Sequence, residues 1–173
     1  MTQEHERAEL DYLFSVTYEE LRRLASTVRR GDPSATLNPT ALVNEAWLKL
    51  AGYPKVSNTS RLHFKRIAAR AMRQVLVEAA RRRNADKRGG SGANFVTFDE
   101  LQGGIACERE LLGLDSALDE LARVEPRQAM MVESRFFGGL EIAEIAQLLE
   151  VSESTILRDW RAAKAWLAHT LRQ

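Results

Sequence analysis

The sequence predicts an all-α protein in which a flexible linker joins two small helical domains. Apolar residues recur three and four positions apart along most of the 173-residue chain, the spacing that places them on one face of a helix. Residues 87–111 depart from this pattern, because their first part is rich in glycine and has no clear helical period. We therefore expect one helical domain over residues 1–86 and a second over residues 112–173.

Three helical segments are expected in the first domain. The apolar spacing over Leu10–Val28 predicts one amphipathic helix or a pair of helices, followed by a break at Gly31–Pro33. Pro39 suits the first turn of a second helix, which should end near Gly52. A third, long helix is expected over Arg61–Arg83.

Positive charge is concentrated in this third helix. Residues 61–90 contain ten basic and two acidic residues, although the whole chain has a formal net charge of only +1. Residues 91–173 are acidic, with eight basic and fourteen acidic residues. A basic segment within a nearly neutral chain indicates that the protein binds a polyanion at one place.

A helical wheel of the third helix predicts a basic arc and an apolar arc. The basic arc, expected to bind nucleic-acid phosphates, contains Lys65, Arg66, Arg70 and Arg73. The apolar arc, expected to face the core, contains Phe64, Ile67, Ala68, Ala71, Met72 and Val75. Two alternatives are a solvated surface, which the charge density disfavours, and a membrane-bound helix, which the alanine-rich apolar arc disfavours.

Residues 140–167 have the pattern of a helix-turn-helix motif. The apolar face of its short first helix consists of Ile142, Ile145, Ala146 and Leu149. Ser152 can cap the second helix through its hydroxyl. The inward face of that second helix is predicted to contain Ile156, Trp160, Ala163 and Leu167, and the opposite face Ser154, Arg158, Arg161 and Lys164. Such an outward face is suited to the DNA major groove, whereas the alternative is an ordinary helical hairpin with solvated cations.

The turn of this motif departs from the usual pattern. Glu150 occupies the position where glycine commonly adopts a left-handed conformation. Because a side chain at Cβ disfavours that conformation, we expect the turn to be either strained or differently shaped.

The composition argues against several other classes of protein. No apolar run approaches the roughly 20 residues that cross a bilayer, and the polar start and single Cys107 predict a cytoplasmic protein without an internal disulfide. The three histidines are scattered, and no glycine-rich phosphate loop is present. We therefore expect no catalytic site, no cofactor and no metal.

Three segments resemble, in order, the extracytoplasmic-function (ECF) subfamily of bacterial sigma-70-type RNA polymerase sigma factors. The segments "TALVNEAWLKL", "HFKRIAARAMRQVLVEAARRR" and "EIAEIAQLLEVSESTILRDWR" are similar to regions 2.2, 2.3–2.4 and 4.2 of that family. The resemblance covers about residues 10–88 and 112–171. It implies a sigma region 2-like domain over residues 1–86, a linker over 87–111 and a sigma region 4-like domain over 112–173.

The resemblance implies a subunit that binds the RNA polymerase core and directs promoter recognition, DNA melting and transcription initiation. The residues implied to contact the clamp of the largest polymerase subunit are Leu42, Val43, Asn44, Glu45, Trp47 and Leu48. Those implied to bind the −10 element and its opened strand are Asn58, Ser60, Arg61, His63, Lys65, Arg66, Arg70 and Arg73. Those implied to read the −35 element are Ser154, Thr155, Arg158, Arg161 and Lys164.

One departure from the family suggests regulation. The acidic run that commonly precedes region 2.2 is replaced here by Asn38, Pro39, Thr40 and Ala41, which should weaken polymerase binding. Phosphorylation of Thr40 or Thr36 by a Ser/Thr kinase would restore negative charge at the start of the second helix. Thr40 could instead be only a helix cap, and an anti-sigma factor could provide the control.

Two alternative functions remain open at this point. One is a free-standing helix-turn-helix transcriptional regulator that does not bind polymerase. The other is an interaction protein that sequesters another factor and leaves the basic face unused.

Overall fold

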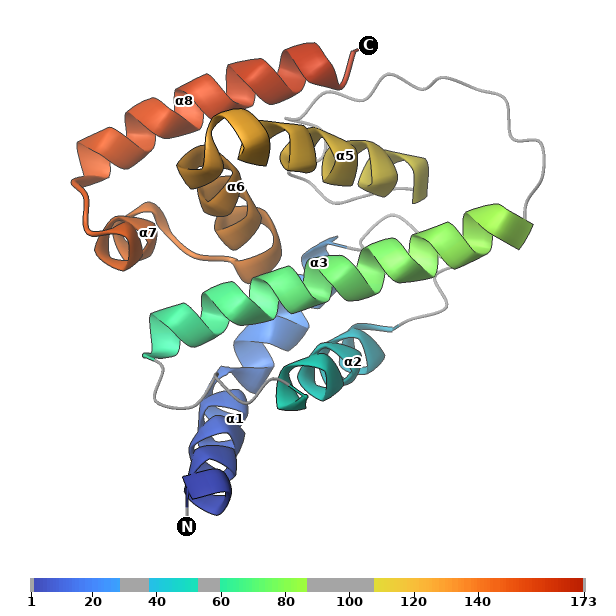
Figure 1. Ribbon diagram of the computed structural model, residues 1–173, viewed down its shortest axis with the longest axis vertical. Helices are drawn as coiled ribbons and strands as arrows, with labels where there is room; N and C mark the ends of the chain where they lie inside the picture. Colours follow the sequence, from blue (N-terminus) through green and yellow to red (C-terminus); the bar gives the residue numbers. More distant parts are fainter. Residues whose placement is uncertain (1, 29–37, 53–59, 87–107, 173) are drawn as a thin grey trace.

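The computed structural model describes residues 2–28, 38–52, 60–86 and 108–172. These residues form seven helices and no strand, which confirms the predicted all-α class (Figure 1). The glycine-rich stretch 87–107 lies outside the described residues. Residues 108–111, which were expected to belong to the linker, are the first turn of a helix.

The first half of the chain contains helices α1 (Thr2–Val28), α2 (Pro39–Ala51) and α3 (Arg61–Asp86). Helix α1 is a single helix and not a pair. Asn38 caps α2, because its side-chain oxygen accepts a hydrogen bond from the Ala41 amide at 2.8 Å. Pro39 fills the first helical position, as predicted.

The second half contains helices α5 (Glu108–Val124), α6 (Pro126–Gly138), α7 (Ile142–Leu149) and α8 (Glu153–Thr170). Gly139 ends α6 in the left-handed conformation with φ 65°, which glycine adopts without strain. Helices α7 and α8 are the two helices of the predicted motif.

Helix α3 lies between the other two helices of the first half and the helices of the second half. It packs against α1 and α2 on one side and against α5, α6 and α7 on the other (Figure 1). A second stripe of buried apolar residues on α3, formed by Ala69, Leu76 and Ala80, accompanies the expected apolar arc. The buried surface of α3 is therefore wider than the helical wheel predicted, and Ile67 is only partly buried.

The two halves share one hydrophobic core. Buried side chains from both halves, among them Leu42, Phe64, Leu114 and Phe137, belong to a single cluster. At one point the backbones approach closely: a methyl group at Gly138 of α6 would lie 2.9 Å from the Ala69 Cβ of α3. Only glycine allows this close approach of α6 to α3 without displacement.

The turn between α7 and α8 is strained. Glu150 has φ 55° and ψ 43°, and among the described residues it is the only one other than glycine with a positive φ. Of the two expectations for this turn, strained or differently shaped, the first is therefore confirmed: Glu150 adopts the left-handed conformation although it carries a side chain. Ser152 then caps α8, since its hydroxyl oxygen accepts a hydrogen bond from the Thr155 amide at 3.2 Å.

Replacing Glu150 by glycine should relieve this strain. We expect Glu150→Gly to raise the free energy of unfolding by about 1 kcal/mol, measured by urea denaturation. The matched control is Glu153→Gly, at an exposed position in the first turn of α8. The control should lower stability by about 0.5–1 kcal/mol, because glycine weakens a regular helix. Equal losses in both variants would show that Glu150 is not strained.

Candidate nucleic-acid and polymerase interface

The basic residues of α3 lie in two different environments. Arg70 is exposed and Arg66 is half-buried, so both side chains can reach a ligand outside the molecule. Lys65 and Arg73, in contrast, face acidic residues of other helices. The expected exposed basic arc is therefore wrong for these two residues, although their proposed DNA contacts stay a prediction.

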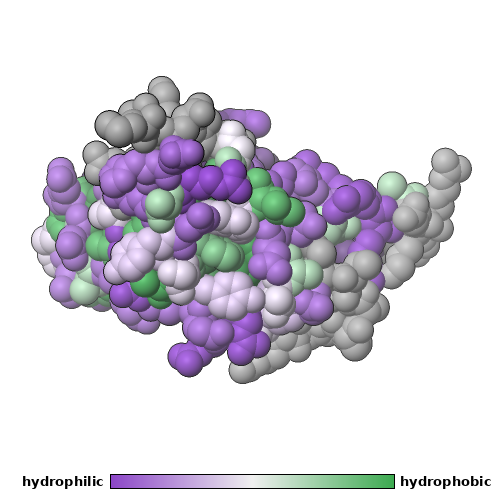
Figure 2. Space-filling model, turned by 90° about the horizontal axis from the view of Figure 1, so that it is seen from below, coloured by the Kyte–Doolittle hydropathy of each residue, from purple (hydrophilic) through white to green (hydrophobic). Residues whose placement is uncertain are grey.

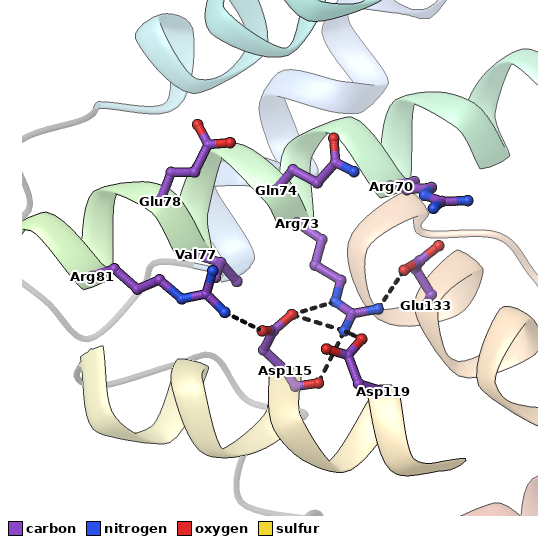
Figure 3. A pocket seen from close by; sticks show the side chains of 9 residues that line it. All are labelled: Arg70, Arg73, Gln74, Val77, Glu78, Arg81, Asp115, Asp119 and Glu133. Atoms are coloured by element: carbon purple, nitrogen blue, oxygen red, sulfur yellow. Dashed lines mark hydrogen bonds and ion pairs between the residues drawn. The ribbon is translucent and has the colours of Figure 1, made fainter. Parts of the chain in front are cut away.

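Arg73 is the centre of an ion cluster between the two halves (Figure 3). Its Nε donates to Asp115 Oδ1 at 2.8 Å, and its Nη1 donates to Glu133 Oε2 at 2.7 Å. Its Nη2 donates to Asp119 Oδ1 at 2.8 Å and to the Asp115 carbonyl oxygen at 2.9 Å. All three guanidinium nitrogens are thus engaged by α5 and α6.

The carboxylates of the cluster stabilise the charged form of Arg73. Burial alone lowers the pKa of the Arg73 guanidinium, because it disfavours the charged form. The hydrogen bond to Glu133, the charges of Asp115 and Glu133 and the bond to Asp115 outweigh burial and raise this pKa above its ordinary value. Arg81 adds a second, weaker contact, with its Nη2 3.5 Å from Asp115 Oδ2.

Lys65 connects three helices. Its Nζ lies 3.2 Å from Glu20 of α1 and 3.3 Å from Glu144 of α7, and Lys65 is only 7% exposed. Along α3, Lys65 is seven residues before Met72 and eleven before Leu76, so it belongs to the buried side of the helix. This spacing explains why the helical wheel placed it wrongly: the second half of the chain covers that side.

The start of α3 brings several of the predicted −10 residues together. Ser60 Oγ lies 3.0 Å from His63 Nδ1, and both residues are exposed. Arg61 is also exposed and forms an ion pair with Glu20. Asn58 lies outside the described residues.

The outward face of α8 is arranged as the motif predicted. Arg158, Arg161 and Ser154 are exposed, whereas Thr155 and Lys164 are half-buried. The hydroxyls of Ser154 and Thr155 lie 3.0 and 2.9 Å from Ser152 Oγ, so three hydroxyls gather at the N-terminus of α8.

Two contacts that the sequence pattern did not predict fix α8 on α6. Asp159 is buried, and its Oδ2 lies 2.7 Å from Arg127 Nη2. The Arg135 guanidinium lies 5.1 Å from the ring centroid of Trp160, a cation–π contact. Asp159 therefore faces α6 and not DNA.

Only part of the predicted polymerase surface of α2 is exposed. Leu42 and Val43 are 0% and 1% exposed and belong to the core, so they cannot contact a partner directly. Trp47 stacks on Phe14 of α1 with 4.5 Å between ring centroids. The exposed members of the predicted set are Asn44, Glu45 and Leu48, and Thr40 is exposed in the first turn.

Leu48 is a conspicuous apolar residue on this helix. It is 65% exposed, which costs hydration free energy in the isolated chain and suits contact with a partner. The face of the molecule seen from below the view of Figure 1 is mostly hydrophilic, with small apolar areas between polar ones (Figure 2). Among the described residues Leu48 is one of five large hydrophobic side chains that are exposed, together with Tyr12, Val16, Val124 and Leu157.

Among the described residues no helix is long and apolar enough to cross a membrane. No group of three or more histidine, cysteine, aspartate or glutamate residues within those ranges could hold a metal ion.

A model of the family described as ECF sigma factor matches residues 2–173. No curated protein and no solved structure matches significantly.

The burial difference on α2 predicts different effects of two alanine substitutions. Leu42→Ala should lower the free energy of unfolding by about 3 kcal/mol, because it leaves a cavity in the core. Leu48→Ala should change it by less than about 0.5 kcal/mol, because the side chain is exposed. Urea denaturation of both variants measures this, and a large loss for Leu48→Ala would contradict the assignment of an exposed face.

Proposed function

The chain belongs to the ECF sigma factors, and from this premise we propose that it binds the RNA polymerase core through α2 and directs transcription initiation through α3 and α8. The family match over residues 2–173 carries this proposal, because it spans all three helices to which we assign these contacts. On this proposal the protein acts in the cytoplasm with its polymerase and performs no chemistry itself.

The exposed side of α2 is the proposed contact with the clamp of the largest polymerase subunit. Asn44, Glu45 and Leu48 supply an amide, a carboxylate and an apolar side chain on one exposed surface. Leu42, Val43 and the stacked Trp47 contribute indirectly, because they hold α2 against α1 and the core. The apolar contact of Leu48 provides an anchor and the polar groups provide specificity.

The −10 element is proposed to bind at the start of α3. Ser60, Arg61 and His63, with the preceding Asn58, would hold an unstacked base, and Arg66 and Arg70 would bind the backbone phosphates. Lys65 and Arg73 could join them only after releasing their carboxylate partners.

The −35 element is proposed to bind at α8. Arg158 and Arg161 project from the outward face and can reach base edges in the major groove. Ser154, Thr155 and Lys164 would bind adjacent phosphates.

Phosphorylation of Thr40 is proposed to strengthen polymerase binding. The exposed hydroxyl stands in the first turn of α2, which lacks acidic residues. A phosphate there would add up to about two negative charges at the positive end of the helix dipole. Asn38 already caps this helix, so the alternative of Thr40 as the cap is wrong. Thr36, the second candidate, lies outside the described residues. A Ser/Thr kinase would add the phosphate, and control by an anti-sigma factor is the alternative to phosphorylation.

The free-standing regulator is less well supported. A helix-turn-helix protein without a polymerase partner would need only α7 and α8, whereas the family match extends over the whole first half.

The polymerase contact predicts a specific loss for Leu48→Asp. We expect this variant to bind core polymerase at least about tenfold more weakly, the loss typical of an interface anchor. It should also initiate less transcription in vitro from genomic fragments. The matched control is Val124→Asp, which adds the same charge at another exposed apolar residue, 63% exposed on α5. Equal binding by the two variants would contradict the proposed surface, and no transcription by the unmodified chain with any template would contradict the function.

The phosphorylation proposal predicts that Thr40→Glu binds polymerase more tightly than Thr40→Ala. A single carboxylate in the first turn should give about a two- to fivefold difference, measured by fluorescence anisotropy with labelled protein. Ser116→Glu, at an exposed position of α5, controls for the change in total charge. Equal affinities for Thr40→Glu and Thr40→Ala would count against the switch.

A further inference from the structure

Leu157 is an exposed apolar residue on the outward face of α8. Its side chain is 43% exposed, and it does not belong to the hydrophobic core cluster. Residues three and four positions apart are neighbours on a helix, so Leu157 lies between Ser154 and Arg161. Both neighbours are exposed, and Arg158, next along the chain, is exposed as well. An apolar side chain therefore stands within the surface that we assign to the −35 element.

We propose that Leu157 is a specificity-determining residue that reads the 5-methyl group of a thymine in the major groove of the −35 element. This inference rests on the proposed function, because it requires α8 to bind that element. It deepens the function by assigning the identity of one base, which membership of the family does not do.

The chemistry of leucine selects thymine among the four bases. Only thymine carries a methyl group at its major-groove edge, where the other bases present hydrogen-bond donors or acceptors. A leucine side chain has no polar atom, so it covers such a donor or acceptor without replacing the hydrogen bond to water that is lost. Leu157 therefore favours thymine by contact and disfavours the other bases by desolvation.

The position of Leu157 along α8 suits a contact with a base edge. Helix α8 begins at Glu153, so Leu157 lies in its second turn. In helix-turn-helix proteins the N-terminal residues of the second helix contact base edges. The exposed residues later in α8 include Ala162 and Ala165, whose small side chains let the helix backbone approach DNA closely. Because a leucine side chain is short, such an approach is what brings it within contact distance of a methyl group.

The rotation of α8 about its own axis is fixed by the contacts of its inner side. Asp159 is buried and pairs with Arg127 of α6, and Arg135 of α6 lies over the ring of Trp160. Leu157 precedes Asp159 by two positions, which turns the two side chains about 200° apart around the helix. Helix α8 lies at one edge of the molecule, packed on α5, α6 and α7 (Figure 1). With Asp159 held against α6, Leu157 is kept on the outward side.

Two other roles of an exposed leucine give different results in the test. Single apolar residues on a protein surface are common and need bind nothing. In that case neither the side chain nor the thymine methyl would affect promoter binding. A contact of Leu157 with a polymerase subunit would make binding depend on the side chain but not on the methyl group.

The test removes the methyl group from the DNA and the side chain from the protein, separately and together. The DNA is a genomic fragment that the unmodified chain transcribes with core polymerase. Each thymine of its −35 region, on either strand, is replaced in turn by deoxyuridine, which lacks only the 5-methyl group and pairs as thymine does. The affinity of the holoenzyme for each fragment is measured by competition binding at fixed salt.

We expect a deoxyuridine at one position to weaken binding by the unmodified chain about three- to fivefold, the effect of one buried methyl group. Leu157→Ala should weaken binding to the thymine fragment by a similar factor and should no longer respond to deoxyuridine at that position. Leu157→Met keeps a long apolar side chain and should retain the response. When the −35 positions are randomised, the unmodified chain should select thymine at that position, and Leu157→Ala should accept other bases there.

The matched control is Val124→Ala on α5. Val124 is also apolar and is 63% exposed, but it lies outside the proposed DNA-binding face. This variant should keep the deoxyuridine response of the unmodified chain. Because Leu157 is exposed, Leu157→Ala should be as stable as the unmodified chain, which urea denaturation checks.

Two results would overturn the proposal. One is that no deoxyuridine replacement weakens binding by the unmodified chain. The other is that a response exists but is the same in Leu157→Ala, which would assign the methyl contact to another residue whether or not this variant binds more weakly overall. Failure of the proposed function would look different: the unmodified chain would transcribe no fragment with core polymerase, and the assignment of Leu157 would fall with it.

Discussion

Helix α3 is buried on two sides, and the arrangement of the other helices follows from that constraint. On one side its apolar residues complete the core formed with α1 and α2. On the other side α5 and α6 cover the buried residues Ala69, Leu76 and Ala80, and Gly138 of α6 allows the closest approach. Charged residues can remain in such an interface only if they are paired, and Arg73 and Lys65 obtain their partners from the opposing helices.

Because the ion cluster lies in this interface, it adds little net stability but fixes how the helices are oriented relative to one another. Placing Arg73 among three carboxylates requires removing all four groups from water in part, which offsets much of their attraction. What the cluster does fix is the direction of approach, because a planar guanidinium donates to carboxylates only along its N–H bonds. The register between α3, α5 and α6 is therefore defined by hydrogen-bond geometry as well as by packing.

The sequence predicted the helices well and their mutual packing poorly. Pro39 and Ser152 are local signals that depend on backbone geometry within a few residues, so their roles at helix ends could be recognised directly. The stripe of Ala69, Leu76 and Ala80 was also present, but two of its members are small and resemble neutral surface residues. The partners of Arg73 could not be found, because pairing across 42 to 60 positions leaves no periodic pattern. For the same reason Leu42 and Leu48 look alike in the sequence, although one is in the core and the other is exposed.

The attachment of α8 to α6 determines which parts of α8 would lose conformational freedom when the helix binds a ligand. Arg127 holds Asp159 and Arg135 covers Trp160, so the inner side of α8 is fixed before any ligand arrives. A preorganised helix loses little backbone or rigid-body freedom on docking. If α8 binds DNA as proposed, the entropic penalty of docking falls mainly on the long, exposed side chains of Arg158 and Arg161, which would lose rotamer freedom at a base edge.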